Sequence, residues 1–115
     1  MDYAVIYDNV GTNYYLVLHN AQTDRWEFLG IDHEDALEQA KEATGITQMK
    51  PIGRMKDDGV TLVLIEANMN IPVSLSSSYD TYLWAPYDRA YEKLTDSSHK
   101  GFLKETEDKL KSLNI

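Results

Sequence analysis

Three glutamates stand four residues apart in one acidic segment, at Glu34, Glu38 and Glu42. If that segment is helical, this spacing places the three carboxylates on one face, and clustered carboxylate oxygens are the ligands that Mg²⁺ prefers. The other interpretation is a solvated acidic face on which Lys41 partly relieves the repulsion between like charges. The spacing therefore gives three candidate metal ligands and leaves both interpretations open.

Histidines and basic residues supply the remaining candidates for chemistry. Three histidines could act as a base or a metal ligand, but none falls at a ligand spacing, and packing or surface roles are the alternative: His19, His33 and His99. Five basic residues could contact phosphate, with surface solubility as the alternative: Lys41, Lys50, Arg54, Lys56 and Arg89. Of these, Arg54 and Lys56 stand close together on a plausible strand end.

Length and charge limit the function classes. The chain has 115 residues, and its 11 basic and 19 acidic residues give a formal charge of −8. This length predicts a single domain over residues 1–115. The charge repels a phosphate backbone and argues against a nucleic-acid partner, but a small nucleotide needs only one local pocket. Cysteine is absent, which excludes disulfides, thiolate zinc sites and thiol nucleophiles.

Membrane and export signals are also weak. The longest apolar run is Leu62–Ile65, which is too short for a transmembrane helix. The first residues show neither a basic segment nor a long apolar segment of the kind that begins a signal peptide. We therefore expect a cytoplasmic protein without a membrane partner.

Hydrophobic patterning predicts a mixed sheet between helices, an α/β (α+β) architecture. Apolar and β-branched runs predict six strands, near residues 4–7, 14–18, 26–28, 49–55, 60–67 and 81–84. Pro51 makes the fourth an edge strand or a bend. Helices are expected at 87–94 and from Ser97 or Ser98 to about Leu113, the last with an apolar stripe at Phe102, Leu103, Leu110 and Leu113.

The clearest helix carries the glutamates. Asp32 is a good N-cap residue, acids fill the first turn, and Gly45 suits the position after the last turn. The buried stripe is expected at Ala36, Leu37, Ala40 and Ala43.

The segment from Tyr14 to Ile46 resembles the Nudix hydrolases. It contains the strand Tyr14–Leu18, then Trp26-Glu27-Phe28, then an acid-started helix that ends Thr44-Gly45-Ile46. The Nudix box ends Arg-Glu-apolar-x-Glu-Glu-x-Gly-apolar, and this pattern lies on residues 38–46. The resemblance implies a Nudix-type α/β/α sandwich with a mixed β-sheet between helices. It also implies Mg²⁺ or Mn²⁺ as the cofactor of an active enzyme.

The last third of the chain resembles the diadenosine tetraphosphate hydrolase branch of that family. The run Tyr82-Leu83-Trp84 corresponds to its Tyr-x-Trp strand, and two helices follow in the expected order. The resemblance implies a substrate groove in which aromatic rings stack on adenine. On this basis Tyr79 and Tyr82 are candidate nucleotide-binding residues, with His19, Arg54 and Lys56 beside them.

Several residues depart from the family pattern at metal-binding positions. The first two glutamates of the box ending correspond to Gln39 and Glu42, the third to Ala43, and a downstream carboxylate to Ser78. The bracing arginine corresponds to Glu38. The loop between Trp26 and Asp32 is about half the family length, which removes a further glutamate. We therefore expect an eroded metal site, because Mg²⁺ gives up its waters reluctantly to an isolated carboxylate.

Three functions remain open. The first is a degenerate Nudix domain, inactive or weak, that binds a nucleotide or a protein partner. The second is an active divalent-metal-dependent hydrolase of nucleoside polyphosphates, such as diadenosine tetraphosphate, which would use Glu42 with Glu38 or Glu34. The third is a structural or oligomerisation module.

Overall fold

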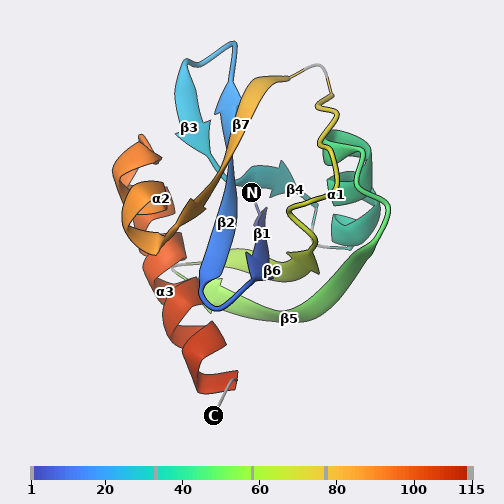
Figure 1. Cartoon of the computed structure of the whole chain (residues 1–115). Helices are drawn as coiled ribbons and strands as arrows, with labels where there is room; N and C mark the ends of the chain where they lie inside the picture. Colours follow the sequence, from blue (N-terminus) through green and yellow to red (C-terminus); the bar gives the residue numbers. More distant parts are fainter. Residues whose placement is uncertain (1, 33, 58, 77, 114–115) are drawn as a thin grey trace.

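Seven strands and three helices make up the described chain (Figure 1). The computed structural model describes residues 2–32, 34–57, 59–76 and 78–113. In chain order the elements are β1 (Asp2–Asn9), β2 (Asn13–Asn20), β3 (Arg25–Glu27), β4 (Leu29–Ile31), α1 (Ala36–Thr44), β5 (Met49–Asp57), β6 (Val60–Ala67), β7 (Tyr79–Pro86), α2 (Tyr87–Lys93) and α3 (Ser97–Leu113).

The sheet is mixed and divides around β1 and β2. Its main order is β3-β2-β1-β6-β5, with β1 and β6 parallel and the other pairs antiparallel. β2 pairs with β1 only at the Tyr7–Asn9 end, whereas β4 pairs with β1 at the Asp2–Ala4 end. β7 pairs with β2 along its length. The strands β2, β3 and β7 therefore diverge from β1, β4, β5 and β6 at one end of the molecule.

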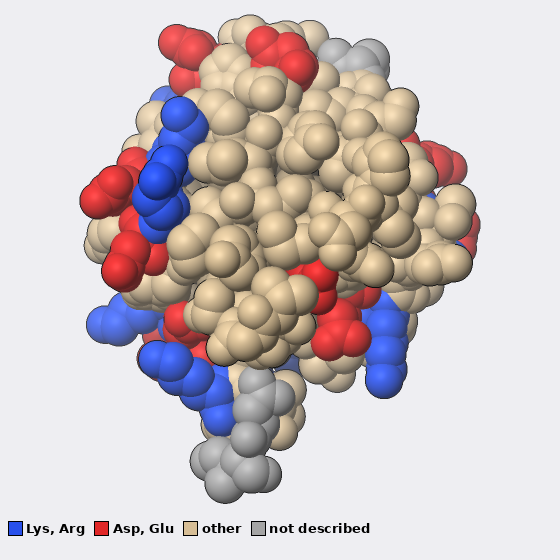
Figure 2. All heavy atoms as spheres, viewed as in Figure 1, with Lys and Arg blue, Asp and Glu red and all other residues tan. Residues whose placement is uncertain are grey.

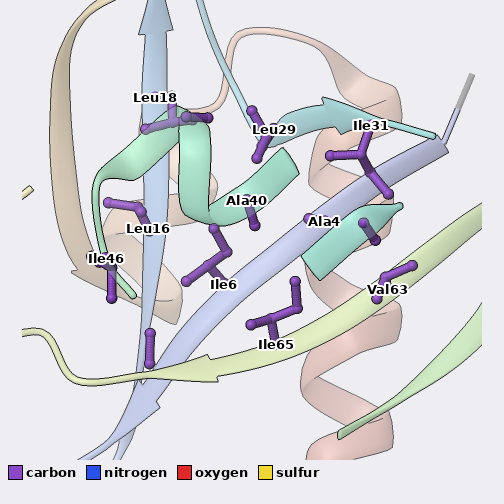
Figure 3. Packing of buried hydrophobic residues seen from close by; sticks show 13 residues of the cluster. Ala4, Ile6, Leu16, Leu18, Leu29, Ile31, Ala40, Ile46, Val63 and Ile65 are labelled. Atoms are coloured by element: carbon purple, nitrogen blue, oxygen red, sulfur yellow. The ribbon is translucent and has the colours of Figure 1, made fainter. Parts of the chain in front are cut away.

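Helices cover both faces of the sheet, with α1 on one side and α2 and α3 on the other (Figure 1). Alternate β1 residues serve the two sides: Ala4 and Ile6 join the cluster under α1, whereas Val5 and Tyr7 join the cluster under α2 and α3. Figure 3 shows Ala40 of α1 above the side chains of the sheet. The predicted mixed sheet between helices is confirmed.

Local sequence signals located several elements correctly. Val60–Ala67 is a strand with the expected bounds, and β5 is an edge strand whose register shifts between Pro51 and Gly53. Gly45 ends α1 with a φ of 73°, in the left-handed region that favours glycine. A Cβ atom there would also lie 3.0 Å from the Cβ of Ser74, so the close approach of that segment needs glycine as well.

Three details differ from the sequence predictions. α1 begins at Ala36 with Asp35 as its N-cap, not with Asp32, because Asp32 heads a turn in which its carbonyl accepts the N–H of Asp35. The strand β4 was not predicted. Leu113 is 51% exposed, because the end of α3 extends past the sheet (Figure 1). No helix in the described ranges combines the length and the apolar character needed to cross a membrane.

His99 is a buried histidine that holds the break between β3 and β4. Its Nδ1 accepts the backbone N–H of Phe28 at 3.1 Å, and its ring lies among those of Tyr3, Phe28 and Phe102. The side chain is 5% exposed, and burial lowers its pKa, opposed by the charge of Asp96. The neutral imidazole is therefore the form that stabilises the fold.

This predicts a pH-dependent contribution of His99 to stability. The unfolded chain takes up the proton near its ordinary pKa of about 6.5, whereas the folded chain resists it. The contribution is full above that pH and is lost as the pH falls below it. In urea unfolding, the free energy of unfolding of the wild type should exceed that of His99→Gln, and this difference should shrink as the pH falls from about 7.5 to about 5. A difference that is constant over this range would contradict the assignment.

Candidate functional site

α1 is tied to the loop in front of it through Gln39. Its side-chain Oε1 accepts the backbone N–H of Asp32 at 2.8 Å. This bond satisfies a donor just after β4 and fixes the turn that leads into the helix. The amide of Gln39 therefore has a structural role in this chain.

The other end of α1 is held by the segment that follows β6, residues 68–76, which we call the strap. The N–H of Ser74 donates to the Thr44 carbonyl at 2.7 Å, and the N–H of Ser76 donates to the Ala43 carbonyl at 3.0 Å. These bonds satisfy carbonyls of the last helical turn, which have no partner within the helix. Strap side chains also pack on the core under α1, namely Ile71, Val73 and Leu75.

Ala43 lies under this contact and is 7% exposed. Its methyl group belongs to the core cluster between α1 and the sheet. A longer side chain at this position would displace the strap or the cluster. Ala43 is thus a packing residue in this chain.

The three candidate glutamates do not form one helix face. Glu34 precedes α1, in the turn headed by Asp32, so the predicted placement of all three on one helix is wrong. Glu38 and Glu42 lie one turn apart on α1 and are both exposed, and Glu38 pairs with Lys41 at 3.9 Å. Across the described ranges, no three histidine, aspartate or glutamate side chains are grouped so that they could hold a metal ion. The described donor set does not fit a divalent cation, which requires several oxygen ligands together.

Tyr82 and Tyr79 lie on the side of the sheet that faces α1. Leu18 stands directly opposite Tyr82, so the two side chains share a face, and Leu18 packs in the cluster under α1. Tyr82 is 38% exposed. Tyr79 is half-buried and packs against the same cluster, and burial raises its pKa, as does the charge of Glu27. The sheet thus brings the two candidate tyrosines to one side.

His19 follows Leu18 on β2, so its side chain points to the other side of the sheet. There it is paired across the strands with Trp26, which packs under α2 and α3. The centroids of the two rings are 5.3 Å apart. Its Nδ1 lies 2.6 Å from Asp80 Oδ1 and its Nε2 lies 2.8 Å from Asp24 Oδ1. Both contacts favour the protonated ring, so the pKa of His19 is raised and that of Asp80 is lowered. The structure therefore separates His19 from Tyr82.

The remaining predicted residues lie elsewhere. Arg54 and Lys56 are on β5, at the far edge of the sheet from β7. The backbone carbonyl of Ser78 accepts the N–H of Ala21. His33 lies outside the described residues.

Glu27 is a further candidate functional residue, which the sequence motifs did not indicate. It stands opposite Leu18 on β3, across β2 from Tyr82. It is half-buried, and burial raises its pKa, opposed by a hydrogen bond with Asn20. The alternation in Trp26-Glu27-Phe28, with both aromatics on the other face, is the signal that could have identified it.

An uncharged surface lies beside these residues. The sequence has no Asp, Glu, Lys or Arg from residue 67 to residue 79, which includes the strap. Figure 2 shows that uncharged side chains fill the centre of the face that carries β7 and the strap, while most charged groups lie at its rim. On a chain with a charge of −8, this surface can accept an uncharged ring with little electrostatic cost.

A separate open cavity of about 530 Å³ lies at the carboxyl ends of the parallel strands β1 and β6. Charged and amide side chains line much of it, including Asp8, Lys50, Glu66, Asn68 and Asn70. Of the predicted site residues, only Lys50 borders it.

Comparison with solved structures identifies the fold. No family model matches the sequence, and no curated protein matches it. A Caenorhabditis elegans Ap4A hydrolase in a binary complex is 20% identical over 96% of each chain, with a TM-score of 0.76. A Nudix hydrolase from Listeria monocytogenes is 17% identical over 96% of this chain and 92% of its own, with a TM-score of 0.67. The Nudix domain of Shewanella oneidensis NrtR, complexed with ADP ribose, is 15% identical over 94% and 85%, with a TM-score of 0.63. The chain has the Nudix fold.

Replacing Ala43 by glutamate tests its assignment as a packing residue. Ala43→Glu should lower the free energy of unfolding by about 1–3 kcal/mol, because a carboxylate must be buried or the strap displaced. The matched control Glu42→Ala, at an exposed neighbour, should change it by less than about 0.5 kcal/mol. Urea unfolding measures both. If Ala43→Glu is as stable as the wild type, position 43 can hold a carboxylate and the assignment fails.

Proposed function

We propose that this chain binds an adenine nucleotide on the α1-facing side of its sheet and hydrolyses it weakly or not at all. The observation that carries the proposal is the position of Tyr82, a partly exposed aromatic ring on that side. Base stacking on such a ring contributes affinity without a cation or a basic side chain. The uncharged strap beside it suits the same ligand.

The solved relatives in fold support the choice of ligand class. One is an Ap4A hydrolase in a binary complex, and another is a Nudix domain complexed with ADP ribose. Ap4A and ADP ribose both contain adenosine joined to phosphates. We propose the same chemical class here, with the base on Tyr82 and Tyr79 and the phosphates directed towards α1.

Weak or absent hydrolysis follows from the residues of α1. A bound cation would neutralise the phosphates and activate the attacking water. In this chain the Gln39 amide holds the N–H of Asp32, and the Ala43 methyl is packed in the core. The exposed carboxylates Glu38 and Glu42 remain, and one of them pairs with Lys41. Two exposed carboxylates hold Mg²⁺ poorly compared with a preformed cage.

The second candidate function is an active metal-dependent hydrolase. It is favoured by the position of Glu38 and Glu42 one turn apart on an exposed face, where both could reach one cation. Glu34, in the turn before α1, would be a third ligand. This candidate predicts cation-dependent turnover, which the binding proposal does not.

A pair of tyrosine substitutions tests the binding proposal. Tyr82→Ala should weaken the affinity for diadenosine tetraphosphate by about tenfold, because the stacking contact is lost. Tyr91→Ala is the matched control, since Tyr91 is 42% exposed on α2, and it should leave the affinity unchanged. Calorimetric titration in EDTA measures both. Equal losses in the two variants, or no binding by the wild type, would reject the site.

The same preparations decide between the two functions. Release of phosphate from diadenosine tetraphosphate is followed with Mg²⁺ or Mn²⁺ and in EDTA. The proposal expects little or no cation-dependent turnover above the uncatalysed rate. Turnover that is lost in Glu42→Gln would instead establish the hydrolase.

A further inference from the structure

β5 is the free edge of the sheet. Among the described strands it pairs with β6 alone, and Figure 1 shows it along the outer margin of the molecule. Alternate N–H and carbonyl groups of such a strand point away from its partner and can pair with an added strand. Pro51 and the register shift after it disturb the first half of β5. The regular stretch that remains available is residues 53–57.

This edge is basic on an acidic protein. Lys50, Arg54 and Lys56 lie on β5 against one acid, Asp57, whereas the whole chain has a charge of −8. All three basic side chains are exposed. Within the described ranges, none of the three takes part in an ion pair of 4.0 Å or less. Their charge is therefore available to a partner.

Two cavities flank the edge. The first, about 280 Å³, is lined in part by Leu37, Ile52 and Val63, with Glu34 among its lining residues. The second, about 330 Å³, is lined by Arg54, Met55, Lys56 and Thr61, and Arg54 borders both. Arg54 stands opposite Val63, which packs under α1, and Lys56 lies two residues further along the strand, so both cations are on the α1 side. Met55 stands opposite Leu62 of the cluster under α2 and α3, so the other side of this edge is apolar.

We propose that β5 docks an acidic, extended peptide segment by β-strand addition. Main-chain hydrogen bonds to residues 53–57 would hold the segment, and its side chains would alternate between the two sides of the sheet. Acidic side chains meet Arg54 and Lys56 on the α1 side. Apolar side chains lie beside Met55 on the other side. The segment therefore alternates acidic and apolar residues.

Charge selects this occupant over a second copy of the chain. Antiparallel pairing of two β5 strands would bring two sets of Arg54 and Lys56 together, and like charges across a strand pair are destabilising. A nucleic acid could neutralise the cations, but it would be repelled by the net charge of the protein and has no N–H donors in strand register. The proposed peptide satisfies both the charges and the backbone groups.

The test uses the full chain and a fluorescein-labelled peptide of about nine residues with alternating glutamate and valine, followed by fluorescence anisotropy. The wild type should bind it, and the double variant Arg54→Glu/Lys56→Glu should weaken binding at least about tenfold. The matched control Lys109→Glu/Lys111→Glu makes the same charge change at exposed positions of α3 and should retain binding within about twofold. Circular dichroism confirms that each variant is folded.

A second peptide tests the backbone contribution. In an added strand every second N–H points towards β5. Two peptides are therefore made, one methylated at the odd-numbered amide nitrogens and the other at the even-numbered ones, so that one of them loses the donors that strand addition needs. One of the two methylated peptides should lose binding. The proposal is overturned if both bind as tightly as the parent, if the α3 control loses as much affinity as the β5 variant, or if a single-stranded oligonucleotide displaces the peptide. Absence of binding by the wild type also overturns it.

Discussion

Hydrogen bonds at the two ends of α1 are the constraint on which the candidate site depends. In front of the helix, the Gln39 side chain accepts the N–H of Asp32. Behind it, the N–H groups of Ser74 and Ser76 donate to the last carbonyls of the helix, beside Gly45 in its left-handed conformation. The first contact fixes how the chain passes from β4 into α1. The second fixes the strap, which leads into β7 and so sets where Tyr79 and Tyr82 stand.

These contacts at the ends of α1 are made by neutral groups. Each such bond contributes about 0.5–1.5 kcal/mol, and leaving a buried donor or acceptor without a partner costs more. The packing of Ala40 and Ala43 against the sheet adds to them. A scaffold that resembles that of the Nudix hydrolases can thus be kept by hydrogen bonds and methyl packing while its carboxylates are few. The uncharged surface beside β7 suits the stacking contact that we propose for this site.

Short sequence patterns are sufficient to predict most of the strands and helices, but they do not predict how all of the candidate site residues are arranged. β6 and the end of α1 follow from an apolar run and from Gly45, both of which act within a few residues. The start of α1 could not be located in this way, because Asp32 and Asp35 are both suitable N-cap residues. The two are distinguished by a contact with Gln39, seven residues after Asp32, whose side chain accepts the N–H of Asp32. β4 was missed because it has three residues and its partner is the distant β1. At the site, strand alternation could have separated His19 from Tyr82, but only once their pairing across β2 and β7 was known.

We infer that the scaffold persists without a cage of carboxylates for divalent cations. The most direct measurement is a titration of the protein with Mn²⁺, followed by the electron paramagnetic resonance signal of the free ion. We expect the signal to rise as it does in buffer, with only the weak binding typical of an acidic surface, and we expect Gln39→Leu to leave the curve unchanged. Stoichiometric uptake of one ion, lost in Glu42→Gln, would contradict it.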